Sequence, residues 1–387
     1  MSRIPAGAQT YSKCRSQLPA NAPDYAVRGD GAKVLCSDGR RYTDWTAALG
    51  PVVLGYRHSD VDDAVIEQVR RGPNFGLPSG LEESTAELLC SLVPGMEKVR
   101  FGKGGGESCA AAVRAARAIT GRLTIVSVGY HGWHAEVGGG PNKSGVLLGN
   151  RREVMELEET RAYLYDSQQV AAYIIEPDRY LGLDYLRSDC DRTGALLIFD
   201  EVLTGFRLAL GGATSHYGVI PDLAVFSKAM GNGYSVSAVA GSARAMEPFA
   251  GGIGYSTTFA GETIGLAAAS ATMSFMRDNP VIEHLAEIGK TLQDGWNATA
   301  KELGLDIPCE GHPSRTVIRY PSLEAKTLVL EKMWEQGQMF TTGFTSTWSH
   351  TTKDVDVALD AARAALLALA SGEKPKGRLC GPVFRQS

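Results

Sequence analysis

The sequence has little of several features that would direct a protein to a special environment. Its seven cysteines are scattered and show no C-x-x-C spacing, so we expect reduced thiols and predict no metal site. The net charge is only −4, which gives no reason to expect nucleic acid or an anionic membrane as a partner. No stretch approaches the roughly 20 apolar residues that span a bilayer, and the N-terminus has no apolar core typical of a signal peptide. These absences favour a cytoplasmic protein.

What is present is an ordinary globular composition, with 44% hydrophobic and 21% charged residues. At 387 residues the chain is too long for one compact core, so a major and a minor domain are expected.

Two apolar blocks are each followed by a charged side chain. The block Ala195 to Phe199 leads directly into Asp200, and Leu223 to Phe226 is followed two residues later by Lys228. Such blocks are typical of parallel strands that are buried on both faces, and ligands of open α/β sheets bind beyond the carboxyl ends of the strands. A lysine and an acid there suit pyridoxal 5'-phosphate (PLP), because the amine can form a Schiff base and the carboxylate can keep the ring nitrogen protonated. Taken alone, the pair is better explained by an acid that caps a loop and a surface lysine.

The residues around this pair resemble the class III (ω-type) aminotransferases, and within them the glutamate-1-semialdehyde aminomutase branch. The family motif D-E-V-x-T-G-F-R matches residues 200–207, and P-D-x-x-x-x-x-K matches residues 221–228. The resemblance extends from about Asp44 to the C-terminal helix. It implies PLP as cofactor, Lys228 and Asp200 as catalytic residues, and PLP-dependent transferase fold type I (aspartate-aminotransferase-like). That α/β fold has a large domain with a mainly parallel seven-stranded sheet and a smaller α/β domain.

A glycine triplet, residues 104–106, runs into an alanine-rich helix and predicts a phosphate cup. Small residues at a helix start let backbone N–H groups approach an anion, which the helix dipole also favours. By resemblance, Gly105 and Gly106 bind the cofactor phosphate, although Gly106 stands where the family usually has a phosphate-binding threonine. Either Ser108, or Lys103 in place of the family asparagine, compensates, or the phosphate is displaced.

The resemblance assigns four further cofactor-binding positions. Tyr130 stacks on one face of the ring, Val202 packs on the other, and Glu176 at a strand end orders the site. Thr258 donates its hydroxyl to the phosphate from the partner chain, which implies a homodimer, although Glu262 and Thr263 replace the usual Asn-Pro nearby. His131 has two interpretations, a buried positioning residue or a catalytic base, and the first is favoured.

The other elements complete two domains. A hairpin is predicted across Asp38-Gly39, and helices are predicted from Ser59 or Asp60, over 84–92, and with Gly194 as a C-cap. Later helices are expected from 281, around 328–336 and over 355–369, with His350 and Asp354 in a helix-cap arrangement. We predict that residues 1–50 join the small domain, that 51–280 form the large PLP-binding domain, and that 281–387 form the C-terminal small domain.

The resemblance implies transfer of an amino group between a small-molecule amino donor and a carbonyl (keto or aldehyde) biosynthetic substrate. A glutamate-1-semialdehyde-type 2,1-aminomutase is the first alternative. A PLP racemase or decarboxylase and a catalytically inactive PLP-binding homologue are further ones.

Overall fold

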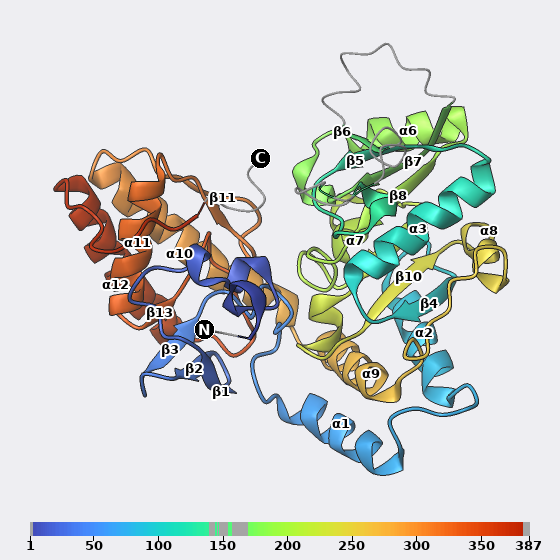
Figure 1. The fold of residues 1–387 in the computed structure, drawn as a ribbon, viewed down its shortest axis with the longest axis horizontal. Coiled ribbons are helices and arrows are strands. Elements are labelled where there is room, and N and C mark those ends of the chain that lie inside the picture. The colour runs from blue at the N-terminus through green and yellow to red at the C-terminus, as the bar shows by residue number, and fades with distance from the viewer. Residues whose placement is uncertain (1–2, 139–143, 145, 147–153, 157–168, 382–387) are drawn as a thin grey trace. The chain divides into compact units, whose positions relative to one another are not determined.

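The computed structural model describes residues 3–138, 144, 146, 154–156 and 169–381 (Figure 1). The chain divides into two compact units. Unit 1 comprises Met1–His58 and Glu283–Ser387, and unit 2 comprises Ser59–Ile282. The sequence analysis placed the corresponding boundaries after residues 50 and 280.

Unit 2 is built around a sheet whose described strands number seven, in the order β4-β10-β9-β8-β7-β5-β6. Their bounds are β4 (Lys98–Gly102), β5 (Thr124–Val128), β6 (Val154–Glu156), β7 (Val170–Ile175), β8 (Leu196–Asp200), β9 (Leu223–Phe226) and β10 (Ser237–Gly241). Neighbours from β9 to β6 run parallel, whereas β10 is antiparallel to both β9 and β4. The predicted α/β fold with a mainly parallel seven-stranded sheet is confirmed.

Helices surround this sheet, which explains why its central strands are apolar without alternation. Every residue of β7, β8 and β9 is buried, as a parallel sheet covered on both faces requires. The α-helices of unit 2 within the described residues are α1 (Ser59–Arg71), α2 (Gly80–Leu92), α3 (Gly105–Thr120), α6 (Leu183–Thr193), α7 (Gly212–Tyr217), α8 (Ala243–Met246) and α9 (Thr263–Asp278). The alanine-rich α3 packs across β10, β9 and β7, and its small side chains let helix and sheet approach closely (Figure 1).

Two helix ends show how local sequence sets the boundaries. Helix α2 begins at Gly80, earlier than the predicted residue 84, because Ser79 caps it. The Ser79 hydroxyl accepts from Leu81 N–H, and the Glu82 carboxylate accepts from Ser79 N–H. Helix α6 ends at the predicted cap, Gly194, which has a φ of 75°.

Unit 1 contains a small sheet in the order β1-β2-β3-β13 and a two-stranded pair, β11 with β12. Its strands are β1 (Ala26–Asp30), β2 (Lys33–Cys36), β3 (Arg41–Asp44), β11 (Cys309–Glu310), β12 (Val317–Ile318) and β13 (Gln338–Met339). Its helices are α10 (Val281–Glu302), which starts at the boundary, α11 (Leu323–Glu335) and α12 (Thr352–Ala370). The predicted hairpin is confirmed, since β2 and β3 pair antiparallel around Gly39.

The core of unit 1 is rich in aromatic residues, among them Trp45, Trp296 and Phe344. Its helix α12 starts with a capping box in which the Asp354 carboxylate accepts from Thr351 N–H at 3.0 Å. The predicted cap is therefore half correct, because Asp354 takes part but His350 does not. The His350 ring instead stacks on Trp45, with 3.9 Å between ring centroids.

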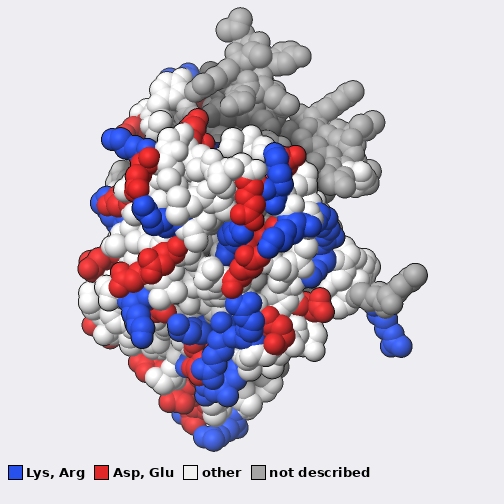
Figure 2. Space-filling view, turned by 90° about the vertical axis from the view of Figure 1, so that its left-hand side faces the viewer, with Lys and Arg blue, Asp and Glu red and all other residues white. Residues whose placement is uncertain are grey.

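The surface carries charges of both signs (Figure 2), and the cysteines are unpaired in the described part of the chain. On the face shown in Figure 2, Lys and Arg side chains intermingle with Asp and Glu. All seven cysteines lie in the described part of the chain, where they form no disulfide. Among the described residues, no helix combines the length and apolar character needed to cross a membrane.

Candidate functional site

Four neighbouring strands of unit 2 end beside residues that the sequence analysis selected. Asp200 is the last residue of β8, and Glu176 directly follows β7. Tyr130 and Lys228 come two residues after β5 and β9. Because β5, β7, β8 and β9 are parallel neighbours whose ends are level in the register, these residues lie along one edge of the sheet.

The Asp200 carboxylate is buried and held from two sides. One oxygen, Oδ2, lies 2.7 Å from Nδ1 of His131, and the other accepts from the N–H of Val202 at 3.1 Å. Asp200 and His131 are each 3% exposed. A buried carboxylate needs hydrogen-bonding or positive partners, and a protonated ring nitrogen of a ligand would be one. His131 thus positions Asp200, in line with the favoured interpretation.

Cys109 completes this buried cluster. A ligand atom of each of Cys109, His131 and Asp200 lies within 4.8 Å of the others. Burial raises the pKa of the Cys109 thiol well above its ordinary value, and the charge of Asp200 acts in the same direction. The thiol therefore stays protonated and neutral beside the Asp200 carboxylate.

Lys228 sits in an unusual backbone conformation. Its φ is 43°, in the left-handed region that a side chain with a Cβ rarely adopts, and it opens a short 3-10 helix, Lys228–Gly231. Such a conformation costs about 1–2 kcal/mol and persists where the surroundings impose it, often at functional sites. The half-buried lysine is therefore oriented by the end of β9 and by the turn that follows.

The start of α3 packs against Val202, which lies two residues after Asp200. A Cβ on Gly105 would lie 2.6 Å from a methyl carbon of Val202, so only glycine allows Val202 to sit there. The Glu107 carboxylate accepts from the N–H groups of Lys103 and Gly104, at 3.2 and 3.3 Å. The N–H groups of Gly105 and Gly106 lie in the first helical turn, where the helix offers them no carbonyl. They suit an anion.

Glu176 connects two of the strand ends. It is 3% exposed, its Oε1 accepts from the N–H of Tyr130 at 3.4 Å, and it forms an ion pair with Arg179. A Cβ on Gly129, whose φ is 109°, would lie 2.8 Å from the Glu176 side chain. The carboxylate thus orders the loop that carries Tyr130.

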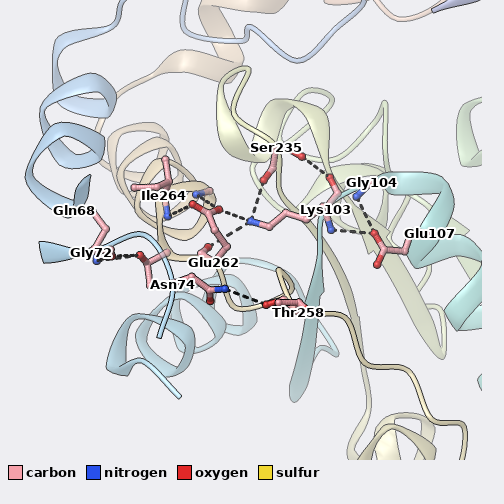
Figure 3. A network of polar contacts seen from close by, with 12 residues as sticks. Gln68, Gly72, Asn74, Lys103, Gly104, Glu107, Ser235, Thr258, Glu262 and Ile264 are labelled. Carbon is pink, nitrogen blue, oxygen red and sulfur yellow. Dashed lines mark hydrogen bonds and ion pairs between the residues drawn. The ribbon is translucent and has the colours of Figure 1, made fainter. Parts of the chain in front are cut away.

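Lys103 and Ser108, the two residues expected to compensate for Gly106, both contact other side chains. In Figure 3 the Lys103 side chain points toward the Glu262 carboxylate and the Ser235 carbonyl. The ammonium lies 2.6 Å from the carboxylate and donates to the carbonyl at 3.3 Å. The Ser108 hydroxyl lies 2.8 Å from that of Ser237, and both are buried. Glu262 itself caps α9 by accepting from the N–H groups of Ile264 and Gly265, at 3.0 and 3.2 Å.

Thr258 lies apart from the strand ends, on an exposed loop before α9. Its carbonyl accepts from the Asn74 side chain at 3.2 Å (Figure 3). Among the described residues, the Thr258 hydroxyl has no hydrogen-bond partner within the chain. It is therefore available to a ligand or a partner chain.

Taken together, these residues fit PLP. Lys228 supplies an amine, Asp200 supplies an oriented buried carboxylate, and the start of α3 supplies N–H donors beside a space that Gly105 leaves open. Sequence reasoning found these three groups from strand ends and a glycine run. It missed the Lys103–Glu262 pair and the contact of His134 with Gly106. No local sequence pattern indicates either contact.

Comparison with known proteins gives a consistent result. The family described as Aminotransferase class-III matches residues 18–137 and 150–311. The chain is 33% identical to the glutamate-1-semialdehyde 2,1-aminomutase of Thermomicrobium roseum (strain ATCC 27502 / DSM 5159 / P-2), over 90% of this chain and 92% of that protein.

Solved structures resemble it over nearly the whole length. The FumI protein of Sphingopyxis sp. MTA144, solved in its PLP internal aldimine form, superposes with a TM-score of 0.90 and 28% identity, covering 96% of each chain. An omega-transaminase from Sphaerobacter thermophilus superposes with a TM-score of 0.82 and 28% identity, covering 91% of this chain and 92% of that one.

Proposed function

The chain belongs to the class-III aminotransferase family and is a PLP-dependent enzyme, and we propose that Lys228 holds the cofactor while Asp200 faces its ring nitrogen. The observation that carries this proposal is the placement of the two residues. Asp200 ends β8 and Lys228 lies two residues after the adjacent parallel strand β9, and Asp200 is fixed by His131 and by a backbone N–H. The strained backbone of Lys228 supports it independently.

The reaction is transfer of an amino group between an amino donor and a carbonyl acceptor. When bound, PLP supplies an aldehyde for amine exchange and a ring that withdraws electrons from the reacting carbon. Lys228 Nζ would hold this aldehyde and, when free, would be the base that takes the proton from the amine-bearing carbon. The negative charge of Asp200 would face the ring nitrogen and would favour its protonated, positively charged form.

The neighbouring residues orient the ligand. We propose that Val202 and Tyr130 contact opposite faces of the ring, and that Glu176 fixes the Tyr130 loop through the backbone N–H described above. The N–H groups of Gly105 and Gly106 bind the phosphate at the positive end of α3.

The proposed assembly is a homodimer in which Thr258 contacts the phosphate held by the partner chain. The exposed Thr258 loop is hydrogen-bonded to the loop that begins at Asn74. These two loops expose large apolar side chains, with Phe75 at 49%, Leu77 at 80% and Phe259 at 60% exposure. Apolar side chains gathered around a polar residue with a free hydroxyl are typical of a subunit interface.

A donor screen tests the reaction. The protein is loaded with PLP and mixed with one amino donor at a time, such as glutamate, alanine or a diamine, while visible absorbance and the released carbonyl product are followed. We expect at least one donor to yield one equivalent of its carbonyl product per site, and Lys228→Ala to yield none. A protein that releases no carbonyl product with any donor would contradict aminotransfer.

The second candidate, a 2,1-aminomutase, is favoured by the 33% identity to the Thermomicrobium roseum relative. A second assay, which supplies one amino-carbonyl compound with and without an added carbonyl acceptor, separates the two. A mutase converts a single amino-carbonyl compound into its isomer and accumulates no separate carbonyl product, whereas an aminotransferase needs an added acceptor to turn over.

A further inference from the structure

The phosphate cup lacks a side-chain donor at the position where the family resemblance predicts one. Residue 106 is glycine, so the first turn of α3 offers only backbone N–H groups there. The two expected substitutes are engaged with other partners, Ser108 with Ser237 and Lys103 with Glu262. Apart from the contact proposed for Thr258 of the partner chain, a side-chain hydrogen bond to the phosphate therefore has to come from another residue of this chain.

The imidazole of His134 lies where a side chain of residue 106 would lie. A Cβ built on Gly106 would be 3.3 Å from His134 Nδ1 and 3.1 Å from the Cα of Gly132. In return, a Cβ on Gly132, whose φ is 107°, would be 2.7 Å from the Cα of Gly106. Two facing glycines therefore let the turn after β5 come against the start of α3 and bring His134 with it.

The Nδ1 atom of His134 is buried, and it has no hydrogen-bond partner among the described residues. A buried polar atom without a partner is costly, so one in a native fold calls for an explanation such as a ligand. The neighbouring Trp133 ring lies beside the imidazole, with 5.0 Å between ring centroids. A buried, unpartnered nitrogen beside the positive end of a helix fits an anionic group.

We propose that His134 binds the phosphate of PLP through Nδ1, in place of the hydroxyl that residue 106 lacks. This inference rests on the proposed function, because it assumes that the phosphate lies at the start of α3. It assigns a specific donor to a site that otherwise consists of backbone groups on this chain.

The test compares two aldehydes, PLP and pyridoxal, which differ only in the phosphate. Each is titrated into the cofactor-free protein, and the dissociation constant is measured by absorbance or equilibrium dialysis. For His134→Ala and His134→Phe we expect PLP affinity to fall by about 10- to 100-fold, the usual loss for one hydrogen bond to a charged group. Pyridoxal affinity should change less than about twofold.

Two further variants separate hydrogen bonding from packing. His134→Asn places an amide close to the position of Nδ1 and should keep most of the PLP affinity, whereas the phenylalanine variant keeps the ring but loses the nitrogen. His216→Ala removes an exposed histidine of the same unit and should leave both affinities unchanged.

Each other outcome overturns the inference. If the alanine and phenylalanine variants bind PLP as the wild type does, His134 is not a phosphate ligand. If they lose PLP and pyridoxal equally, the residue supports the site as a whole. A wild-type protein that binds neither aldehyde would instead refute the proposed function, and this inference with it.

Discussion

The ion pair between Lys103 and Glu262 gives a prediction that can be worked from the structure. The two side chains are 2.6 Å apart and only 22% and 20% exposed. They lie 159 residues apart in the chain, and they join the start of the phosphate cup to the cap of α9 (Figure 3). The family resemblance places asparagine at both positions, so the two departures form one compensating pair.

We predict a coupling free energy of about 1–2 kcal/mol between these positions. Exposed ion pairs contribute up to about 1 kcal/mol, and removal of one partner of a fully buried pair costs about 3–5 kcal/mol. This pair lies between those limits. Lys103→Asn leaves a partly buried carboxylate without its cation, and Glu262→Asn leaves a partly buried ammonium without its anion while keeping a good N-cap residue. The double variant removes both charges and restores the family residues.

The assay is a double-mutant cycle on the free energy of unfolding in urea, followed by circular dichroism. The four proteins must share one slope against urea for their free energies to be compared. We expect the double variant to lose less free energy of unfolding than the sum of the losses of the two single variants, and the difference is the coupling free energy. A coupling below about 0.3 kcal/mol, which is within ordinary additivity, would refute the argument that the two departures compensate. The same cycle on PLP affinity should show the double variant binding more tightly than either single variant.

Three further predictions concern the start of α3, the interface and pH. Gly105→Ala should weaken PLP binding by at least about tenfold, because the new Cβ would lie 2.6 Å from Val202, whereas Gly104→Ala meets nothing within 4 Å and should bind as the wild type does. Mixed subunits of Lys228→Ala and Thr258→Ala should regain activity that neither has alone, because one site per hybrid dimer then carries both residues; no recovery would place Thr258 in its own chain's site. The neutral His350 has a pKa lowered from 6.5 to about 3 by burial, so its contribution to stability is present above pH 6.5 and is lost as pH falls toward 3. In that range stability should fall by about 1.4 kcal/mol per pH unit more in the wild type than in His350→Asn, measured by urea unfolding at several pH values.

Much of the fold followed from local patterns in the sequence. Uninterrupted apolar blocks identified β8 and β9, because a parallel sheet buries both faces of its strands. The positions of Asp200 and Lys228 then followed from the rule that ligands bind beyond strand ends. The strand β10 and its antiparallel pairing were not predicted, since its sequence, SAVAG, is too short and too rich in small residues to indicate a direction.

Contacts between distant segments could not be predicted in the same way. Lys103 and Glu262 were recorded as separate departures from a family pattern, and only the folded chain shows that they meet. His134 gave no signal because its relevance depends on two glycines, Gly106 and Gly132, that approach each other across the start of α3. The short strands β11 and β13 of unit 1 escaped detection because strands of two residues carry no periodicity.

The most direct test of the account is to locate the residue that carries the cofactor. The protein is loaded with PLP, reduced with borohydride so that the bond to the lysine becomes permanent, digested, and mapped by mass spectrometry. The account predicts the pyridoxyl phosphate group on Lys228, with none on that peptide in Lys228→Ala. Attachment to another lysine, or a wild-type protein that carries no covalent cofactor after reduction, would contradict the assignment of the site.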